Sequence, residues 1–326
     1  MSCATEDLLR TVHAKAREGI ERGRLADYIP ALTRADKRWA GLALTDLAGR
    51  RLAVGDCRIP FSLQSASKPF TLLAALERRG HAEVFKHVGY EPSGDPFYSL
   101  VQLEHEQGRP RNPFINAGAI AVASLLPGDT PEEKCRSVQQ LIEAATGKPV
   151  VVDEEVCRSE SETGFRNRAI AYFMRNFKVI EGDPIVAVEA YFRACSMLTT
   201  AEELSDLGLL LAGLGRHPTT GSVVDPEHVR ICLSLMTTCG LYDGSGGWAV
   251  KVGLPAKSGV SGGIVAVSPW RGAIATFGPA IDHQGTSIFG EQALTILAHA
   301  LDWGMFDPIH PLEPLEAQGA AATPAR

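Results

Sequence analysis

The sequence predicts an α+β fold in which an antiparallel sheet, flanked by the terminal helices, carries an inserted all-helical lobe. Strand-like segments occur near both ends of the chain, at residues 39–55 and 262–277, and most of the chain between them has helical periodicity. Helix-patterned segments also precede the first strands and follow the last ones. Since consecutive elements usually lie side by side, both ends should build one sheet and the middle a second lobe.

The N-terminal part predicts a helix followed by a hairpin. Residues 4–23 carry apolar side chains at helical spacing, from Leu8 to Ile20, opposite a charged face. Trp39–Thr45 and Arg51–Gly55 have the composition of short strands, and the turn-forming residues 46–50 lie between them.

The middle of the chain predicts a series of helices. Pro69 is tolerated only in the first turn of a helix, so a helix begins within a few residues before it and runs to a stop near Gly80. Further helical runs are Thr130–Thr146, Glu162–Asn176, Pro184–Cys195, Thr200–Gly213 and Pro226–Cys239.

The last third of the chain contains strand-like segments again, after the helical middle. Gly262–Val267 and Gly272–Phe277 predict two strands joined by a turn, and a final helix follows over residues 286–302. The expected domains are a discontinuous sheet lobe (1–67 and 243–312), a helical lobe (68–242) and a disordered, Ala/Pro-rich tail (313–326).

Composition narrows the possible classes of protein. The 326 residues are 45% hydrophobic and 21% charged, with a net charge of −6, which is ordinary globular composition. No block of five basic residues, no apolar run of 18 residues and no export signal occurs, so we expect no nucleic-acid partner, no membrane segment and a cytoplasmic location. The seven cysteines form no Cys-x-x-Cys pair and the nine histidines no cluster, so reduced thiols and no metal are expected.

Ser65 and Lys68 form a Ser-x-x-Lys pair at the predicted helix start. Three residues make almost one helical turn, so both side chains lie on one face. A lysine can take the proton of a serine hydroxyl when burial or nearby positive charge lowers its pKa. Free N–H groups at a helix start would also stabilise an oxyanion. The pair predicts acyl transfer through serine, although such a pair also occurs by chance in many chains.

A second segment reads Lys257-Ser258-Gly259-Val260-Ser261-Gly262-Gly263. Taken alone, it is typical of a glycine-rich turn that opens a core strand. Together with Ser-x-x-Lys, it matches serine acyltransferases of the β-lactamase and penicillin-binding type. Lys257 is expected to add positive charge that helps to keep Lys68 neutral.

Other polar residues occur in a specific order with these two motifs. Taken singly, each has a structural explanation as a helix cap, a solvated charge or a core tyrosine. In chain order the segments read Tyr-Ile-Pro, Gln-Ser-x-Ser-Lys, Asn-Pro-x-x-Asn-Ala-Gly-Ala-Ile, Ser-Glu followed by Arg-Asn, Tyr-Phe-x-x-Cys-Ser, Gly-x-Tyr-Asp and Leu-Pro-Ala-Lys-Ser-Gly-Val-x-Gly-Gly-Ile. From Tyr28 to Leu301 this series resembles the serine-dependent glutaminase family, which shares the β-lactamase/transpeptidase-like fold.

The resemblance implies hydrolysis of L-glutamine to L-glutamate and ammonia without a cofactor. It makes Ser65 the nucleophile and Lys68 its base, with a γ-glutamyl ester as intermediate. The hydroxyls of Tyr28 and Tyr242 would hold or move protons, and the N–H groups of Ser65 and Val260 would form the oxyanion hole. The residues implied to bind the amino-acid end are Asn116, Glu160, Asn167 and Tyr191. The family further implies a homo-oligomer, a dimer or tetramer.

Two alternative functions stay open at this point. A β-lactam-binding protein or cell-wall amidase would use the same serine–lysine pair, although the missing export signal argues against it. A catalytically inactive relative would serve as a binding or sensor protein, although the intact Ser65, Lys68, Tyr28 and Tyr242 argue against that.

Overall fold

A computed structural model of the chain describes residues 4–94 and 99–307, so the predicted tail at 313–326 lies outside the described residues. One five-stranded antiparallel sheet organises the fold, in the order β2-β1-β7-β6-β5. Its strands are β1 (Gly41–Asp46), β2 (Arg51–Gly55), β5 (Ala256–Ser258), β6 (Gly263–Ser268) and β7 (Gly272–Phe277). Because β7 pairs with both β1 and β6, the two ends of the chain share one sheet, as the sequence predicted.

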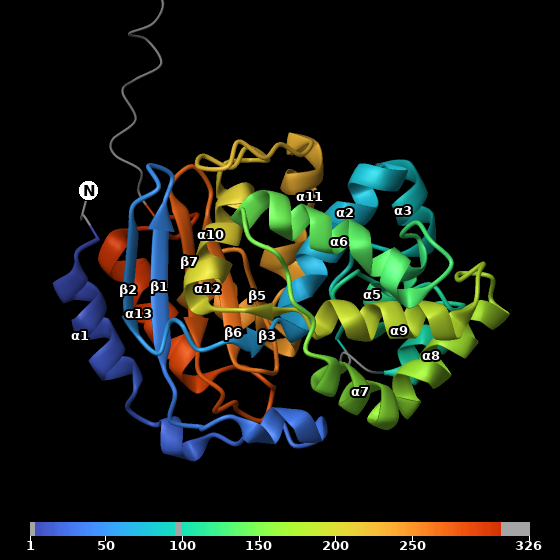
Figure 1. Cartoon of the computed structure of the whole chain (residues 1–326), viewed down its shortest axis with the longest axis horizontal. Helices are drawn as coiled ribbons and strands as arrows, with labels where there is room; N and C mark the ends of the chain where they lie inside the picture. The colour runs from blue at the N-terminus through green and yellow to red at the C-terminus, as the bar shows by residue number, and fades with distance from the viewer. Residues whose placement is uncertain (1–3, 95–98, 308–326) are drawn as a thin grey trace, which may run out of the picture.

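The terminal helices cover one face of this sheet. Helices α1 (Glu6–Ala16) and α13 (Ile288–Leu301) pack on each other, and both lie beside the strands at the left of Figure 1. Strand side chains alternate between the two faces. Leu42 and Leu44 therefore join the apolar cluster under these helices, whereas Ala43 joins the cluster on the other side.

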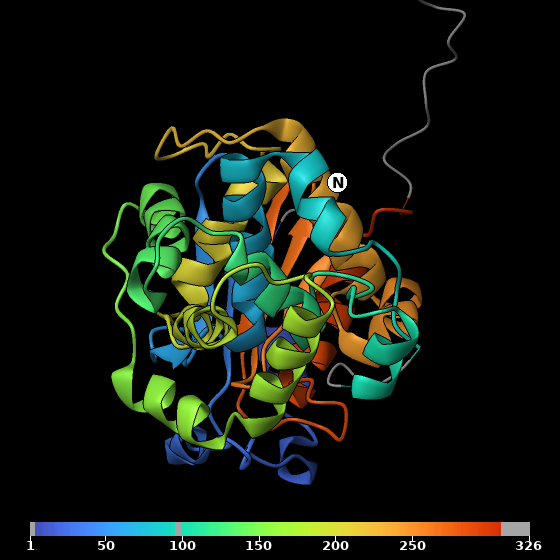
Figure 2. The ribbon, with the colours of Figure 1, turned by 90° about the vertical axis from the view of Figure 1, so that its right-hand side faces the viewer.

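Helices from the middle of the chain pack on the opposite side of the sheet (Figures 1 and 2). Helix α10 (Ala201–Ala212) packs directly on β1, β6 and β7. The other helices of this region are α2 (Lys68–Arg79), α3 (His81–His87), α4 (Leu100–His105), α5 (Asn116–Ser124), α6 (Pro131–Thr146), α7 (Glu154–Thr163), α8 (Phe165–Asn176), α9 (Pro184–Cys195) and α11 (Pro226–Cys239). Helix α12 (Ser245–Lys251) instead contributes Trp248 to the apolar cluster under the terminal helices. A two-stranded sheet, β3 (Phe61–Ser62) with β4 (Leu198–Thr199), joins the two regions.

Two predicted helices differ from the observed ones. The helix expected over residues 4–23 ends at Ala16, and a short 3₁₀ turn at Ile20–Arg22 follows Gly19, whose φ of +89° interrupts the helix. The single helix expected over Glu162–Asn176 is two helices, α7 and α8, separated by Gly164. A Cβ on Gly164 would lie 2.4 Å from the Phe192 ring, so glycine permits the close packing of this junction on α9.

The remaining predicted elements occur within a few residues of their expected bounds. Among the described helices, none is both long enough and apolar enough to cross a membrane.

Candidate active site

Ser65 lies on a 3₁₀ turn, Gln64–Ser67, that leads from β3 into α2. The sequence placed Ser65 at the start of the helix itself, but α2 begins three residues later, at Lys68. Gln64 adopts a left-handed backbone with φ of +50°, and the Ser67 hydroxyl donates to its carbonyl oxygen at 2.8 Å. Such strained positions persist where the surrounding structure fixes them, and they are frequent at active sites.

The end of β5 packs directly against this turn. A Cβ on Gly259 would lie 2.4 Å from the Leu63 carbonyl oxygen, so only glycine allows this approach. Gly259 thereby brings Val260 to the cavity that also contains Ser65. The Val260 N–H donates to no acceptor among the described residues.

Lys68 is almost completely buried beneath that cavity. Its Nζ donates to the Phe114 carbonyl oxygen at 3.0 Å and to Asn116 Oδ1 at 2.9 Å. Burial lowers the pKa of Lys68 to about 8, although the charge of Glu160 opposes this shift. Near neutral pH a larger fraction of Lys68 is therefore a neutral amine than for an ordinary lysine.

All the other site residues predicted from the sequence line one cavity of about 160 Å³. They are Tyr28, Ser65, Asn116, Glu160, Asn167, Tyr191, Tyr242 and Val260. Residues separated by more than 200 positions in the chain therefore meet, and Lys68 is connected to the group through Asn116.

Glu160 is the buried carboxyl of this cavity. It is 6% exposed, and its Oε1 accepts a hydrogen bond from Gln64 Nε2 at 2.8 Å. No cationic side chain among the described residues forms an ion pair with it, and burial raises its pKa to about 8. A buried carboxyl without a cation favours a ligand that supplies one.

Amide and phenol groups form a hydrogen-bonded wall opposite Ser65. Asn116 Nδ2 donates to Asn167 Oδ1 at 3.1 Å, and the Tyr191 hydroxyl donates to Asn116 Oδ1 at 3.3 Å. Burial raises the pKa of Tyr191 well above its ordinary value, so its hydroxyl stays a donor. These groups provide neutral donors within reach of a small polar ligand.

Two tyrosines lie at other edges of the cavity. Tyr242 has a left-handed backbone, and its hydroxyl donates to the Ser258 carbonyl oxygen at 3.4 Å. Burial raises the pKa of Tyr242 to about 12, although contact with the Ser65 hydroxyl favours its ionised form. Tyr28 is 53% exposed, which suits a position at the mouth of the cavity.

Lys257 was expected to add positive charge that keeps Lys68 neutral. Its Nζ is fully buried, donates to the Ser258 carbonyl oxygen at 2.7 Å and lies 4.3 Å from the centroid of the Tyr242 ring. Burial, aided by the charge of Lys68, lowers the pKa of Lys257 well below its ordinary value. Burial is also the main cause of the lowered Lys68 pKa, so the contribution of Lys257 stays a prediction.

The sequence assigned no role to Gln64, which the structure connects to both Glu160 and Ser62. Its position directly before Ser65, within a recognised motif, was the available signal. The Phe114 carbonyl oxygen, which accepts a hydrogen bond from Lys68, could not have been predicted from the sequence. Every residue has a main-chain carbonyl, so the residue type does not indicate this role.

Comparisons with known proteins agree with this geometry. The glutaminase family model matches residues 23–306. A glutaminase of Rhizobium meliloti (strain 1021) is 45% identical over 93% of this chain and 98% of its own, and one of Methylobacterium sp. (strain 4-46) is 45% identical over 92% and 99%.

Solved structures are similar over the same length. A probable glutaminase from Bacillus subtilis complexed with 6-diazo-5-oxo-L-norleucine superposes with a TM-score of 0.85 at 34% identity, covering 94% of this chain and 98% of that one. The covalent complex of the Bacillus subtilis glutaminase YbgJ with 5-oxo-L-norleucine has a TM-score of 0.83 at 35% identity, covering 91% and 98%. This chain therefore has the β-lactamase-like fold and belongs to the glutaminase family of hydrolases.

Proposed function

We propose that this enzyme hydrolyses L-glutamine to L-glutamate and ammonia through a γ-glutamyl ester on Ser65, with Lys68 as the base. The observation that carries the proposal is the buried, partly neutral Lys68, one turn after a serine that lines the cavity. A neutral amine has two N–H groups, and the acceptors at Phe114 and Asn116 use both of them. Its lone pair is therefore not used by these two acceptors, and we assign it to the proton of the Ser65 hydroxyl.

Acylation begins when Lys68 takes the Ser65 proton and the serine oxygen attacks the side-chain amide carbon. The tetrahedral oxyanion accepts hydrogen bonds from the N–H groups of Ser65 and Val260. The C–N bond then breaks, the proton passes to the leaving nitrogen, and ammonia departs. Tyr242 contacts the Ser65 hydroxyl and is the group best positioned to relay this proton.

Deacylation repeats the sequence with water as the nucleophile. Water loses a proton to the same base and attacks the ester carbon. The ester C–O bond breaks, Ser65 regains its proton, and L-glutamate leaves. We assign Tyr28 to the mouth of the site. During deacylation its hydroxyl group would exchange a proton near Ser65 or form a hydrogen bond with the departing L-glutamate.

Charge complementarity explains why free glutamine is the substrate. The ammonium group supplies the cation that Glu160 lacks, and the amide N–H groups of Asn116 and Asn167 bind the carboxylate. The Tyr191 hydroxyl joins them by turning from Asn116 Oδ1 to the carboxylate. A site that pairs both charges discriminates against peptides, because its buried polar groups would stay unpaired. The Bacillus subtilis complexes with a glutamine analogue support this assignment.

The test is ammonia release from L-glutamine by the pure protein. Release should disappear in Ser65→Ala and persist in Ser234→Ala, which removes an exposed hydroxyl from α11. Absent release with covalent labelling by penicillin would instead favour a β-lactam-binding protein. Glutamine binding without turnover would favour an inactive sensor.

Three further parts of this proposal rest on the sequence. We assign the sheet lobe to residues 1–67 and 243–312 and the helical lobe to residues 68–242. The family resemblance supports a homo-oligomer, dimer or tetramer. A cytoplasmic location stays a prediction.

A further inference from the structure

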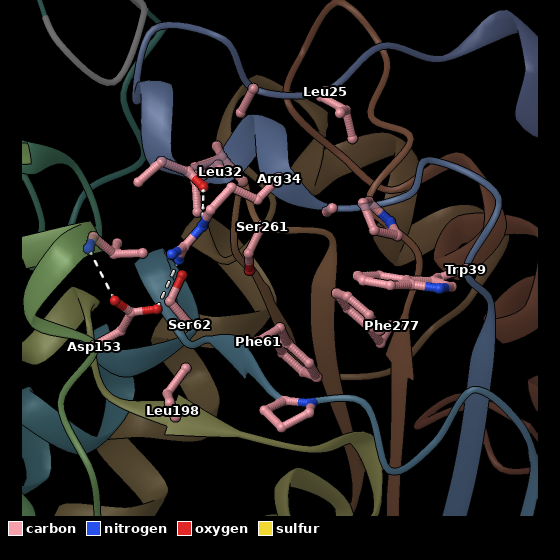
Figure 3. A pocket seen from close by; sticks show the side chains of 17 residues that line it. Leu25, Leu32, Arg34, Trp39, Phe61, Ser62, Asp153, Leu198, Ser261 and Phe277 are labelled. Carbon is pink, nitrogen blue, oxygen red and sulfur yellow. Dashed lines mark hydrogen bonds and ion pairs between the residues drawn. The ribbon is translucent and has the colours of Figure 1, made fainter. Parts of the chain in front are cut away.

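A second cavity, of about 200 Å³, adjoins the catalytic one and plays no part in the proposed reaction (Figure 3). Its walls come from the segment at residues 25–39, from β3 and from β7. Val260 lines both cavities, so the two have a wall residue in common.

Aromatic and aliphatic side chains form most of the second cavity. The rings of Phe61 and Phe277 stack with centroids 4.3 Å apart, and the Trp39 ring lies 6.2 Å from Phe277. Leu25, Leu32 and Leu198 add aliphatic surface (Figure 3). An apolar cavity of about 150 Å³ is large enough to bind benzene. The cavity beside Phe61 is therefore large enough for a substituted single ring.

One polar atom in this wall has no partner. Ser261 is 7% exposed, and its hydroxyl makes no hydrogen bond with any described residue. Figure 3 shows the Ser261 side chain directed into the space between the labelled residues. Because an unpaired buried hydroxyl costs free energy, a ligand that hydrogen-bonds to it gains affinity.

The charged groups of the cavity already satisfy one another. Arg34 forms an ion pair with Asp153 at 2.9 Å and donates to the Ala31 carbonyl oxygen at 2.9 Å. Asp153 also accepts from the first N–H groups of α7. Neither group offers an uncompensated charge, so the cavity favours a neutral ligand.

We propose that this cavity is a second binding site, for a small neutral aromatic molecule that hydrogen-bonds to Ser261 through one hydroxyl group. The site is distinct from the catalytic cavity, because neither Ser65 nor Lys68 lines it, although the two cavities share Val260. Phenol and benzene are suitable probes, since they share the ring and differ in the hydroxyl.

The test is calorimetric titration of the full chain with each probe, with L-glutamate present at saturation to occupy the catalytic cavity. We expect one saturable phenol site per chain. Ser261→Ala should weaken phenol binding about two- to tenfold, the worth of a neutral hydrogen bond, and leave benzene binding unchanged. It should fold normally, because it removes an unpaired hydroxyl.

A space-filling variant tests the location. Ala35→Leu places extra carbon atoms in the cavity and should abolish binding of both probes, whereas Ala48→Leu, on an exposed turn, should not. Unfolding temperature and circular dichroism verify that both variants are folded. Absent saturable binding, phenol binding that survives Ala35→Leu, or an equal effect of Ser261→Ala on both probes would overturn the proposal.

Discussion

Replacing Glu160 by glutamine should make the enzyme more stable and less active at the same time. The substitution keeps the shape of the side chain and its hydrogen bond from Gln64 but removes the ionisable group. In the folded chain the pKa of Glu160 is about 8, against 4.5 for an ordinary glutamate. At pH 7 the unfolded chain therefore ionises this group, whereas the folded chain keeps it mostly protonated.

The change in the free energy of unfolding follows from the difference between the folded and unfolded pKa values of Glu160. The folded state loses stability as pH rises from 4.5, and the loss is complete above the folded pKa of about 8. Over the roughly 2.5 pH units between 4.5 and pH 7, at about 1.4 kcal/mol each, the folded state loses about 3.5 kcal/mol of stability. Glu160→Gln removes it, so the unfolding temperature should rise by several degrees at pH 7 and hardly change at pH 4.

Activity should change in the opposite direction. Loss of a charge-assisted hydrogen bond to the substrate ammonium costs about 1.5–3 kcal/mol, so kcat/KM should fall roughly 10- to 100-fold. Glu162→Gln is the matched control, because Glu162 is an exposed residue on the same helix. Steady-state ammonia release and scanning calorimetry measure the two effects. A kcat/KM within threefold of the parent, or a lower unfolding temperature, would refute the reasoning.

The remaining predictions concern Lys68, Lys257, the pH profile and Gly164. Lys68→Met should lower kcat by about 10²–10⁴, the usual worth of a general base, and residual activity above a tenth of the parent's would contradict that role. Since Lys68 and Glu160 both work deprotonated, kcat/KM should rise with pH through about 8, and a flat profile between pH 6 and 9 would exclude these two groups. Since burial of Lys68 is the main cause of its lowered pKa, this acidic limb should stay at the same pH in Lys257→Met, whereas a shift of one unit would show that Lys257 supplies positive charge. Gly164→Ala should destabilise the fold by about 1–3 kcal/mol, because its Cβ meets the Phe192 ring, while Gly182→Ala has open space and serves as control; equal effects on the denaturation midpoint would count against the packing argument.

The general fold was predictable from the sequence because its signals are local. Strand-like segments at both ends of the chain are sufficient to predict a shared sheet, and the observed pairing of β7 with β1 confirms it. The break at Gly164 was missed, since the reason for it is a contact with Phe192 on another helix. Local periodicity contains no information about such a contact.

The prediction of the site was limited by the same lack of information about tertiary contacts. Motif order indicated residues that do line one cavity, but the charge state of Lys257 depends on burial, which the sequence does not reveal. Gln64 was passed over because its role depends on the distant Glu160. The second cavity was not predicted at all, because its wall residues are unremarkable apolar side chains until the fold brings them together.

The reactive serine is the central claim, and 6-diazo-5-oxo-L-norleucine tests it most directly. After incubation with this glutamine analogue, the protein is digested and the labelled peptide is mapped by mass spectrometry. We expect one covalent adduct, on Ser65, which disappears in Ser65→Ala together with ammonia release from L-glutamine. An adduct on another residue, or ammonia release that survives Ser65→Ala, would contradict it.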